Sequence, residues 1–482
     1  MRTSTKRNRL ISILLAMTLA SALFVAVPQT AFAADATALK TTIEGFDHAG
    51  QGTLSATVSG NTVTVTGSVV GAVNIILLDI DPGITVVWKA SYHCVGTQAG
   101  LALINVKGGG TFEVSEGGSI IQSSLDGPAI GSHGSGIIRV NGGTVSSGDL
   151  RTIVVEGPGR VEVISGTVVN HNPGDGSAIY AGAQATSVTI SGGEVLAYGS
   201  GATIATNTGT GAFLLTVSGG FVDHTGMGPV RGIAIHSQGA GEAIHVSGGI
   251  VQSSTGNAIL ATGLGSSVEV SGGFVHGVGI YPAIEARDIT VGPGAWVRAG
   301  GENDAIMAIG RDSVVTINGG RVTAGNGFAI LADDYSTVTI NGGFVFAFGT
   351  AVTGDFNDVI LMFAGYPTMT LSGTGIVCAW NQAAGHSEYA AGTADDLVVE
   401  PANTAAWGIN DCGFGISYTY GSATGFLWLV GVHVEVPTGP PAPAELINQS
   451  QASSLLTVSK IGFISKTVEE IKFAELASIR VK

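Results

Sequence analysis

Three aspartates in the second half of the chain have a spacing that could bring their carboxylates together. Asp288, Asp312 and Asp334 each follow a short phrase rich in alanine and isoleucine. Carboxylates stacked about 5 Å apart repel one another unless a cation bridges them, and Ca²⁺ prefers such oxygen ligands. The spacing therefore predicts a candidate calcium site. The simpler interpretation is that Arg287 and Arg311 neutralise the carboxylates, or that exposed loops hold them apart.

Phenylalanines recur at one position of a repeated phrase and could stack against sugar rings. Phe221, Phe274 and Phe344 each directly follow a Gly-Gly pair. Side chains alternate along a strand, and this position is expected to point outward, with Phe346 and Phe348 extending the same surface. Exposed rings on a flat sheet favour glycan stacking or a partner surface. The open alternative is that a loop, a cap or a second subunit covers these rings.

Motifs of polysaccharide-cleaving enzymes are incomplete in this chain. A glycosidase needs two placed carboxyl groups, and a lyase needs carboxylates with a basic residue beside them. His133 lies in GSHGSG, and Asp333-Asp334 and Asp395-Asp396 form acidic pairs, but no complete motif surrounds them. No lysine occurs between Lys107 and Lys460. We therefore predict no catalytic residue.

These residues belong to a repeat, written for example as VTISGGEV and VTINGGFV. A second phrase, such as GSAIYA or GNAILA, recurs with the same period. Each repeat thus contains three short segments with alternating apolar residues, which is typical of strands. A Ser or Asn precedes every glycine pair of this repeat except the one at Gly117, which predicts a polar ladder at a corner. The first glycines of the pairs are Gly117, Gly142, Gly192, Gly219, Gly248, Gly272, Gly319 and Gly342.

The repeat predicts an all-β, right-handed parallel β-helix of about 11 rungs with about 25 residues each. The leucine-rich frame and the calcium-binding nonapeptide are absent, and a propeller blade needs about 40 residues. The 75 glycines among 482 residues disfavour long helices, in which each glycine costs about 1 kcal/mol. Rungs spaced about 4.8 Å apart would form a rod roughly 50 Å long.

Composition indicates an exported, acidic protein. Residues 1–33 have the basic, apolar and Ala-Phe-Ala segments of a secretory signal peptide, and no later stretch is apolar enough to span a membrane. Export predicts a secreted or cell-surface location. The net charge is −15, which argues against nucleic acid as a partner and is compatible with Ca²⁺ as a ligand.

The regions outside the regular repeats predict a domain order. Residues 34–100 are rich in strand patterns but out of phase, so we interpret them as an N-terminal cap and first irregular rungs. Residues 101–375 form the β-helix, and residues 376–436, which contain three of the five tryptophans, form a C-terminal β cap. A proline-rich linker follows at 437–450, and no role is predicted for 451–482.

The phrase V-T-I-S-G-G-x-V-x-A with its G-N-A-I partner resembles the glycine-rich parallel β-helix repeats of Gram-positive surface proteins. That group belongs to the pectate-lyase-like superfamily. The resemblance covers roughly residues 50–436 and implies an extracellular role facing polysaccharide, without implying a particular chemistry. We expect a non-catalytic protein that binds extracellular polysaccharide or acts as an adhesin. A lyase or hydrolase acting on pectin-like acidic glycans and a structural envelope component stay open as alternatives.

Overall fold

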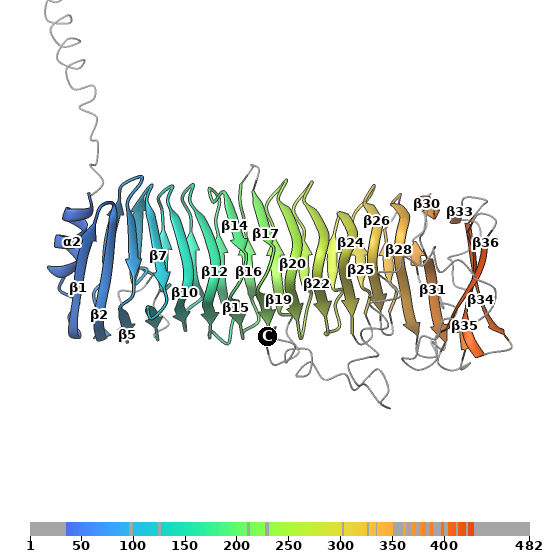
Figure 1. Cartoon of the computed structure of the whole chain (residues 1–482), viewed down its shortest axis with the longest axis horizontal. Helices are drawn as coiled ribbons and strands as arrows, with labels where there is room; N and C mark the ends of the chain where they lie inside the picture. The colour runs from blue at the N-terminus through green and yellow to red at the C-terminus, as the bar shows by residue number, and fades with distance from the viewer. Residues whose placement is uncertain are drawn as a thin grey trace, which may run out of the picture.

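The chain folds into a β-solenoid of about 11 turns, drawn as a straight rod in Figure 1. The computed structural model describes residues 35–95, 100–123, 127–209, 213–226, 231–300, 303–324, 327–333 and 335–349, and the strands β29 to β36 beyond them. The signal peptide, linker and tail expected from the sequence lie outside the described residues. No described helix is long and apolar enough to cross a bilayer.

One side of the solenoid is a 12-stranded sheet, to which each turn contributes one short strand. Neighbouring strands run parallel, and the x-A-I-x-A phrases of the sequence supply most of them. The strands are β3 (Ile76–Ile80), β6 (Ile104–Gly108), β9 (Ile130–Ser132), β11 (Arg151–Val155), β13 (Ser177–Ala181), β16 (Ala202–Thr206), β19 (Ile233–Ser237), β21 (Ile259–Ala261), β23 (Ile284–Ala286), β25 (Ile306–Ala308), β27 (Ile330–Ala332) and β29 (Ile360–Met362).

A 21-stranded sheet supplies the other two sides, because its strands bend or break at the glycine pairs. Its members before the middle of the rod are β1 (Gln51–Ser59), β2 (Thr62–Ala72), β4 (Thr85–Trp88), β5 (Ser91–Cys94), β7 (Thr111–Ser115), β8 (Ser119–Gln122), β10 (Ile137–Ser147), β12 (Arg160–Asn170), β14 (Ser187–Ile190) and β15 (Glu194–Ala197). The rest are β17 (Leu214–Val217), β18 (Phe221–His224), β20 (Ala243–Ser253), β22 (Ser267–Gly277), β24 (Asp288–Ala299), β26 (Val314–Ala324), β28 (Thr337–Gly349), β30 (Thr368–Leu371), β31 (Ile376–Asn381), β32 (His386–Glu388) and β33 (Leu397–Val399).

The core is a set of aliphatic columns, as the repeat predicted. Val188, Leu215 and Ile244 pair in register on successive turns, and each is at most 2% exposed. β-branched side chains suit such a narrow sheet-lined core. The turns differ in length: fewer residues separate the in-register partners Val268 and Ile289 than separate Leu215 and Ile244. The longer turns therefore place their extra residues in the loops.

The two glycines of a pair have different roles at the corner. In most pairs the second glycine has a positive φ, for example 75° at Gly220. The first lies close to the preceding turn: a Cβ on Gly219 would lie 2.4 Å from the Ser191 carbonyl oxygen. Both a left-handed backbone and close packing thus exclude larger residues. The polar ladder is present where Asn341 Nδ2 donates to Asn318 Oδ1 at 2.9 Å.

The N-terminal end of the rod is covered by helix α2 (Ala36–Glu44) and the β1–β2 hairpin. Asp35 caps the helix by accepting a hydrogen bond from Ala38 N at 2.8 Å, and Leu39 and Ile43 are buried beneath it. Regular parallel stacking already begins at β2, which pairs with β4 and β5. The cap protects an edge that would otherwise pair with other chains.

The C-terminal end changes from parallel to antiparallel pairing. β31 and β33 still continue the rungs, through β28 and β30. An antiparallel three-stranded sheet follows, made of β34 (Asn403–Asn410), β35 (Gly413–Tyr420) and β36 (Ala423–Trp428). This sheet lies near the end of the rod in Figure 1, where β34 contacts β31 and β32.

Candidate functional site

The outer face of the large sheet, just after the glycine bend, carries a line of large side chains that we call the aromatic column. Each member pairs in register with the next turn, so the line runs along the rod. All members are partly exposed. The aromatic column consists of Glu194, Phe221, Ile250, Phe274, Trp296, Arg321 and Phe344.

The structure brings three of the five predicted phenylalanines onto this one line. Phe221, Phe274 and Phe344 all belong to the aromatic column. Phe346 lies in the neighbouring outward column and stacks on Phe344, with ring centroids 5.5 Å apart. The Phe348 side chain lies outside the described part of the chain; its backbone pairs with Trp380.

A second line, the polar column, runs beside the aromatic column two residues further along each strand. Its members also pair in register from turn to turn. An apolar line and a hydrogen-bonding line therefore lie side by side on one outer face. The polar column consists of Leu196, Asp223, Gln252, His276, Arg298, Thr323 and Phe346.

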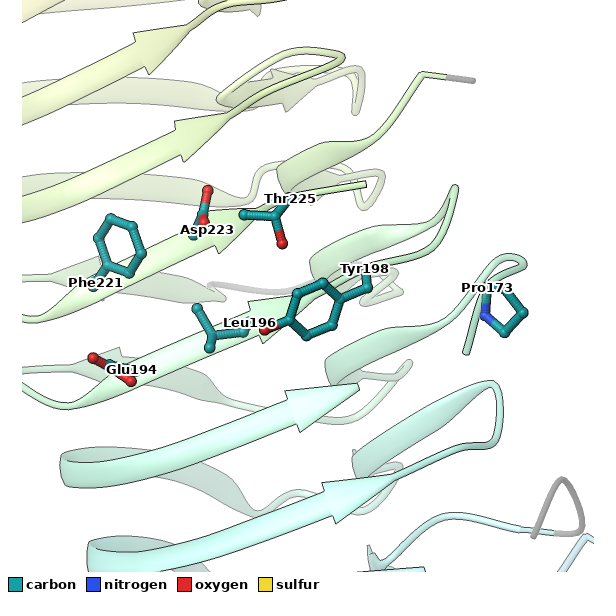
Figure 2. Close-up of a pocket in the computed structure, with 7 residues that line it drawn as sticks. All are labelled: Pro173, Glu194, Leu196, Tyr198, Phe221, Asp223 and Thr225. Atoms are coloured by element: carbon teal, nitrogen blue, oxygen red, sulfur yellow. The ribbon is translucent and has the colours of Figure 1, made fainter. Parts of the chain in front are cut away.

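At one end of these columns the face is hollowed into a groove of about 600 Å³, shown in Figure 2. Two adjacent strands, β15 and β18, line it with outward side chains, and Tyr198 at its rim is 43% exposed. The Tyr198 ring stacks on His171, with centroids 5.5 Å apart and planes 3° apart. The lining residues are Pro173, Glu194, Leu196, Tyr198, Phe221, Asp223 and Thr225.

Asp223 is the buried acid of this groove. Its side chain is 3% exposed, and its Oδ1 accepts no hydrogen bond from any described residue. Burial raises the pKa of Asp223 to about 6, and hydrogen bonds from Gln252 and the His224 backbone lower it only in part. Thr225 Oγ1 is also buried without a hydrogen-bond partner among the described residues. Since buried polar atoms are nearly always satisfied, these two atoms suit a bound hydroxyl or water.

Further along the columns, Trp296 is surrounded by rings and cations. Its ring lies 4.8 Å from the Phe274 ring, and its indole N–H donates to Thr323 Oγ1 at 3.0 Å. The guanidinium carbons of Arg298 and Arg321 lie 5.9 and 5.6 Å from the Trp296 ring. The indole is therefore held firmly, with one face or edge near each cation.

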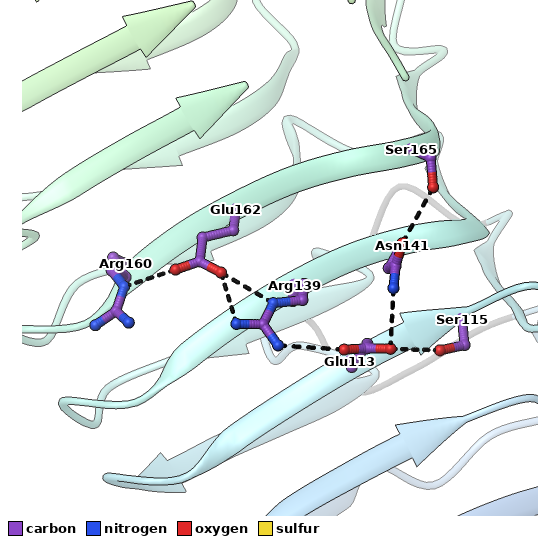
Figure 3. Close-up of polar contacts among 7 residues, drawn as sticks. All are labelled: Glu113, Ser115, Arg139, Asn141, Arg160, Glu162 and Ser165. Atoms are coloured by element: carbon purple, nitrogen blue, oxygen red, sulfur yellow. Dashed lines mark hydrogen bonds and ion pairs between the residues drawn. The ribbon is translucent and has the colours of Figure 1, made fainter. Parts of the chain in front are cut away.

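On the side of the large sheet before the glycine bend, by contrast, arginines are fully paired with glutamates (Figure 3). Arg139 lies between Glu113 and Glu162, at 3.3 and 2.8 Å, and Arg160 contacts Glu162 at 2.9 Å. Burial opposes ionisation of both glutamates, but hydrogen bonds and the arginines outweigh it, so the pKa of each is lowered. This ladder ties three successive turns together and has the properties of a structural element.

The predicted calcium ligands are only partly placed by the structure. Asp288 begins β24 and pairs with Val314, so Asp312 lies outside its column, in a turn where its φ is 61°. Asp334 lies outside the described residues. Within the described ranges, no group of three His, Cys, Asp or Glu side chains could hold a metal ion. The calcium site thus stays a prediction that rests on the sequence.

Comparison with known proteins gives this chain no family. No protein-family model, no curated protein and no solved structure matches it. The resemblance to glycine-rich surface proteins therefore stays a hypothesis based on the repeat phrases.

The sequence pattern missed several members of the candidate site. Trp296 follows Gly-Pro-Gly-Ala in place of the usual Gly-Gly, and the register shift after Val291 moves it into the aromatic column. Counting to the first large residue after the glycines would have found it. Asp223 and Arg298 lie at outward positions that the alternation also predicts, but their burial depends on side chains from neighbouring turns. No local signal shows that burial.

Proposed function

We propose that this protein is a non-catalytic, extracellular carbohydrate-binding protein, and that a polysaccharide chain lies along the aromatic and polar columns. The observation that carries the proposal is the register of Phe221, Phe274, Trp296 and Phe344 on one outward line. Each step along this line is one strand spacing, about 4.8 Å, so a linear polymer parallel to the rod meets a ring or aliphatic side chain at most turns between Phe221 and Phe344, the exception being Arg321.

The two columns match the two kinds of surface on a sugar. The C–H face of a pyranose packs against aromatic rings, while its hydroxyl groups need hydrogen-bond partners. Asp223 and Gln252 supply carboxyl and amide groups beside the aromatic line. Asp223 Oδ1 and Thr225 Oγ1, which are buried and have no hydrogen-bond partner among the described residues, become acceptors for the sugar when these two lining side chains turn toward the groove. The groove is the place where one sugar unit would be held most closely.

Binding to a panel of immobilised polysaccharides, with and without calcium, tests this function. Phe221→Ala and Tyr198→Ala are expected to weaken binding by about ten-fold or more, the loss of roughly one stacking contact each. Tyr335→Ala is the matched control, since this ring is 38% exposed but lies away from the columns. Unchanged binding by the two groove variants would reject the groove. Self-assembly of the rods without binding to any polysaccharide would favour a structural envelope role.

One observation favours glycoside hydrolysis as a second candidate function. Asp223 and Glu194 lie diagonally on adjacent strands and both line the groove. Strand geometry puts such Cα atoms about 8 Å apart, so two carboxyl groups on the same face of these strands can reach the separation of about 6.5–9.5 Å that inverting glycosidases use. An acid whose pKa is about 6 suits proton donation near neutral pH. Release of reducing sugar by the wild type, lost in Asp223→Asn, would establish hydrolysis, and no release would leave binding alone.

A further inference from the structure

Arg298 and Arg321 differ from the paired arginines of the ladder because neither has a counter-charge among the residues that the structure describes. Among the described residues neither forms an ion pair or a hydrogen bond, and each guanidinium group lies near the Trp296 ring. Burial lowers the pKa of both guanidinium groups, yet an arginine stays charged in proteins. Two partly desolvated positive charges are thus held beside one indole.

This arrangement is unusual in so acidic a chain. Acidic residues outnumber Lys and Arg by 35 to 20, so carboxylates are plentiful. Four described arginines each have a glutamate partner, namely Arg139, Arg151, Arg160 and Arg231. Arg287 and Arg311 also form no ion pair among the described residues, so what sets Arg298 and Arg321 apart is that burial desolvates their unpaired charges. A desolvated charge without a partner lowers stability. Its retention at two adjacent positions of one surface indicates that the partner is external.

No other charged group of the two columns supplies the missing partner. His276 pairs in register with Arg298, and burial together with the Arg298 charge lowers the pKa of His276 to about 3, so it is neutral. The next members, Gln252 and Thr323, carry no charge. Asp223, the nearest acid of the polar column, lies three strands from Arg298, or about 14 Å.

We propose that Arg298, Arg321 and Trp296 form a subsite for an anionic group on the bound glycan: a carboxylate, a sulfate or a phosphate ester. The inference rests on the proposed function and names the class of polysaccharide. The indole packs on the sugar ring, and the two guanidinium groups donate hydrogen bonds to the anionic substituent. The acidic surface elsewhere repels such a polymer, so this subsite also sets where along the rod it binds.

Calorimetry with a uronic-acid oligomer and its methyl ester tests the subsite, and a sulfated neutral oligomer separates carboxylate from sulfate recognition. The wild type is expected to bind the charged oligomer at least about ten-fold more tightly than the ester. The preference should vanish in Arg298→Gln/Arg321→Gln. It should persist in Arg287→Gln/Arg311→Gln, which removes the same charge away from the columns. Trp296→Ala should weaken binding of both oligomers.

The outcomes separate the subsite from the proposed function. Equal binding of acid and ester by the wild type, or a preference that survives in Arg298→Gln/Arg321→Gln, overturns the subsite and leaves glycan binding in place. If neither oligomer nor any other glycan binds, the proposed function is wrong. Crystals soaked in selenate then test separately whether Arg298 and Arg321 bind an anion. A selenate ion contacting both guanidinium groups supports it, and no selenate there rejects it.

Discussion

Asp223 and His224 are consecutive residues of β18 whose side chains lie on opposite faces of the same strand. Asp223 points outward into the groove, whereas His224 points into the core and is fully buried. Burial raises the pKa of Asp223 to about 6 and lowers the pKa of His224 to about 4. Burial thus favours the neutral form of both side chains, and their effects on stability have opposite dependence on pH.

Asp223→Asn is expected to raise the melting temperature at pH 8 more than at pH 4. Between about pH 4 and 6 the unfolded chain releases this proton while the folded chain retains it, so the free energy of unfolding falls as pH rises. A shift of about two units corresponds to up to about 3 kcal/mol. Thr225→Val, which alters the same groove without a titrating group, is the control. An equal effect of Asp223→Asn at both pH values would contradict the buried acid.

His224→Gln is expected to reduce acid sensitivity. As pH falls from about 6.5 to 4, the unfolded chain binds a proton at this histidine and the folded chain does not, so stability falls with pH. The loss is up to about 3 kcal/mol. Because Asp223 acts in the opposite direction over much of this range, the comparison belongs in an Asp223→Asn background. Melting temperatures at pH 7.5 and 4.5 measure it, and parallel pH profiles with and without His224 would reject the prediction.

Glu242→Gln is expected to destabilise the middle of the rod by about 1–3 kcal/mol at neutral pH. The carboxylate is 1% exposed and accepts hydrogen bonds from Ser237, from Thr206 at 2.6 Å and from Thr208 N at 2.9 Å. In Glu242→Gln the side-chain NH₂ group replaces one carboxylate oxygen, so a hydrogen-bond donor would face groups that themselves donate.

The effect of Glu242→Gln should shrink in acid. Burial opposes ionisation, but the hydrogen bonds outweigh it and lower the pKa of Glu242. Its stabilising contribution is therefore present above the unfolded pKa of about 4.3 and is lost as pH falls through the folded value. Chemical unfolding at pH 7 and pH 3 measures this, with the exposed Glu269→Gln as control. A loss of stability that does not change with pH would argue against an ionised carboxylate.

Gly249→Ala and Gly71→Ala separate the two reasons for glycine at corners. Both residues have a φ of 72°, but a Cβ on Gly249 would lie 2.7 Å from the Gly219 carbonyl carbon, whereas Gly71 faces open space. Gly71→Ala should cost about 1 kcal/mol from backbone strain alone. Gly249→Ala should cost clearly more, since adjacent turns must separate. Unfolding midpoints in denaturant compare them, and equal losses would mean that close packing between turns adds nothing.

Much of the fold was predictable because its determinants are local and repeated. Most turns present an aliphatic residue at the same place, so Val188, Leu215 and Ile244 could be aligned from the sequence, and they do stack. Phe221, Phe274 and Phe344 could be aligned for the same reason. The prediction failed to find Trp296, because its turn replaces Gly-Gly by a longer phrase. It expected Phe346 to extend the surface of Phe344, and the structure places Phe346 in the neighbouring outward column, stacked on Phe344.

The sequence alone determined the solenoid, its corners and the outward direction of most site residues, because alternation along a strand and repetition between turns depend on residue type and spacing. Only the tertiary structure decided which outward residues matter. The desolvation of Asp223, and the lack of a counter-charge at Arg298 and Arg321 within the described part of the chain, depend on side chains from the turns on either side. Those turns differ in length and composition, so the sequence of a single repeat predicts neither the burial of Asp223 nor the lack of a described partner for the two arginines.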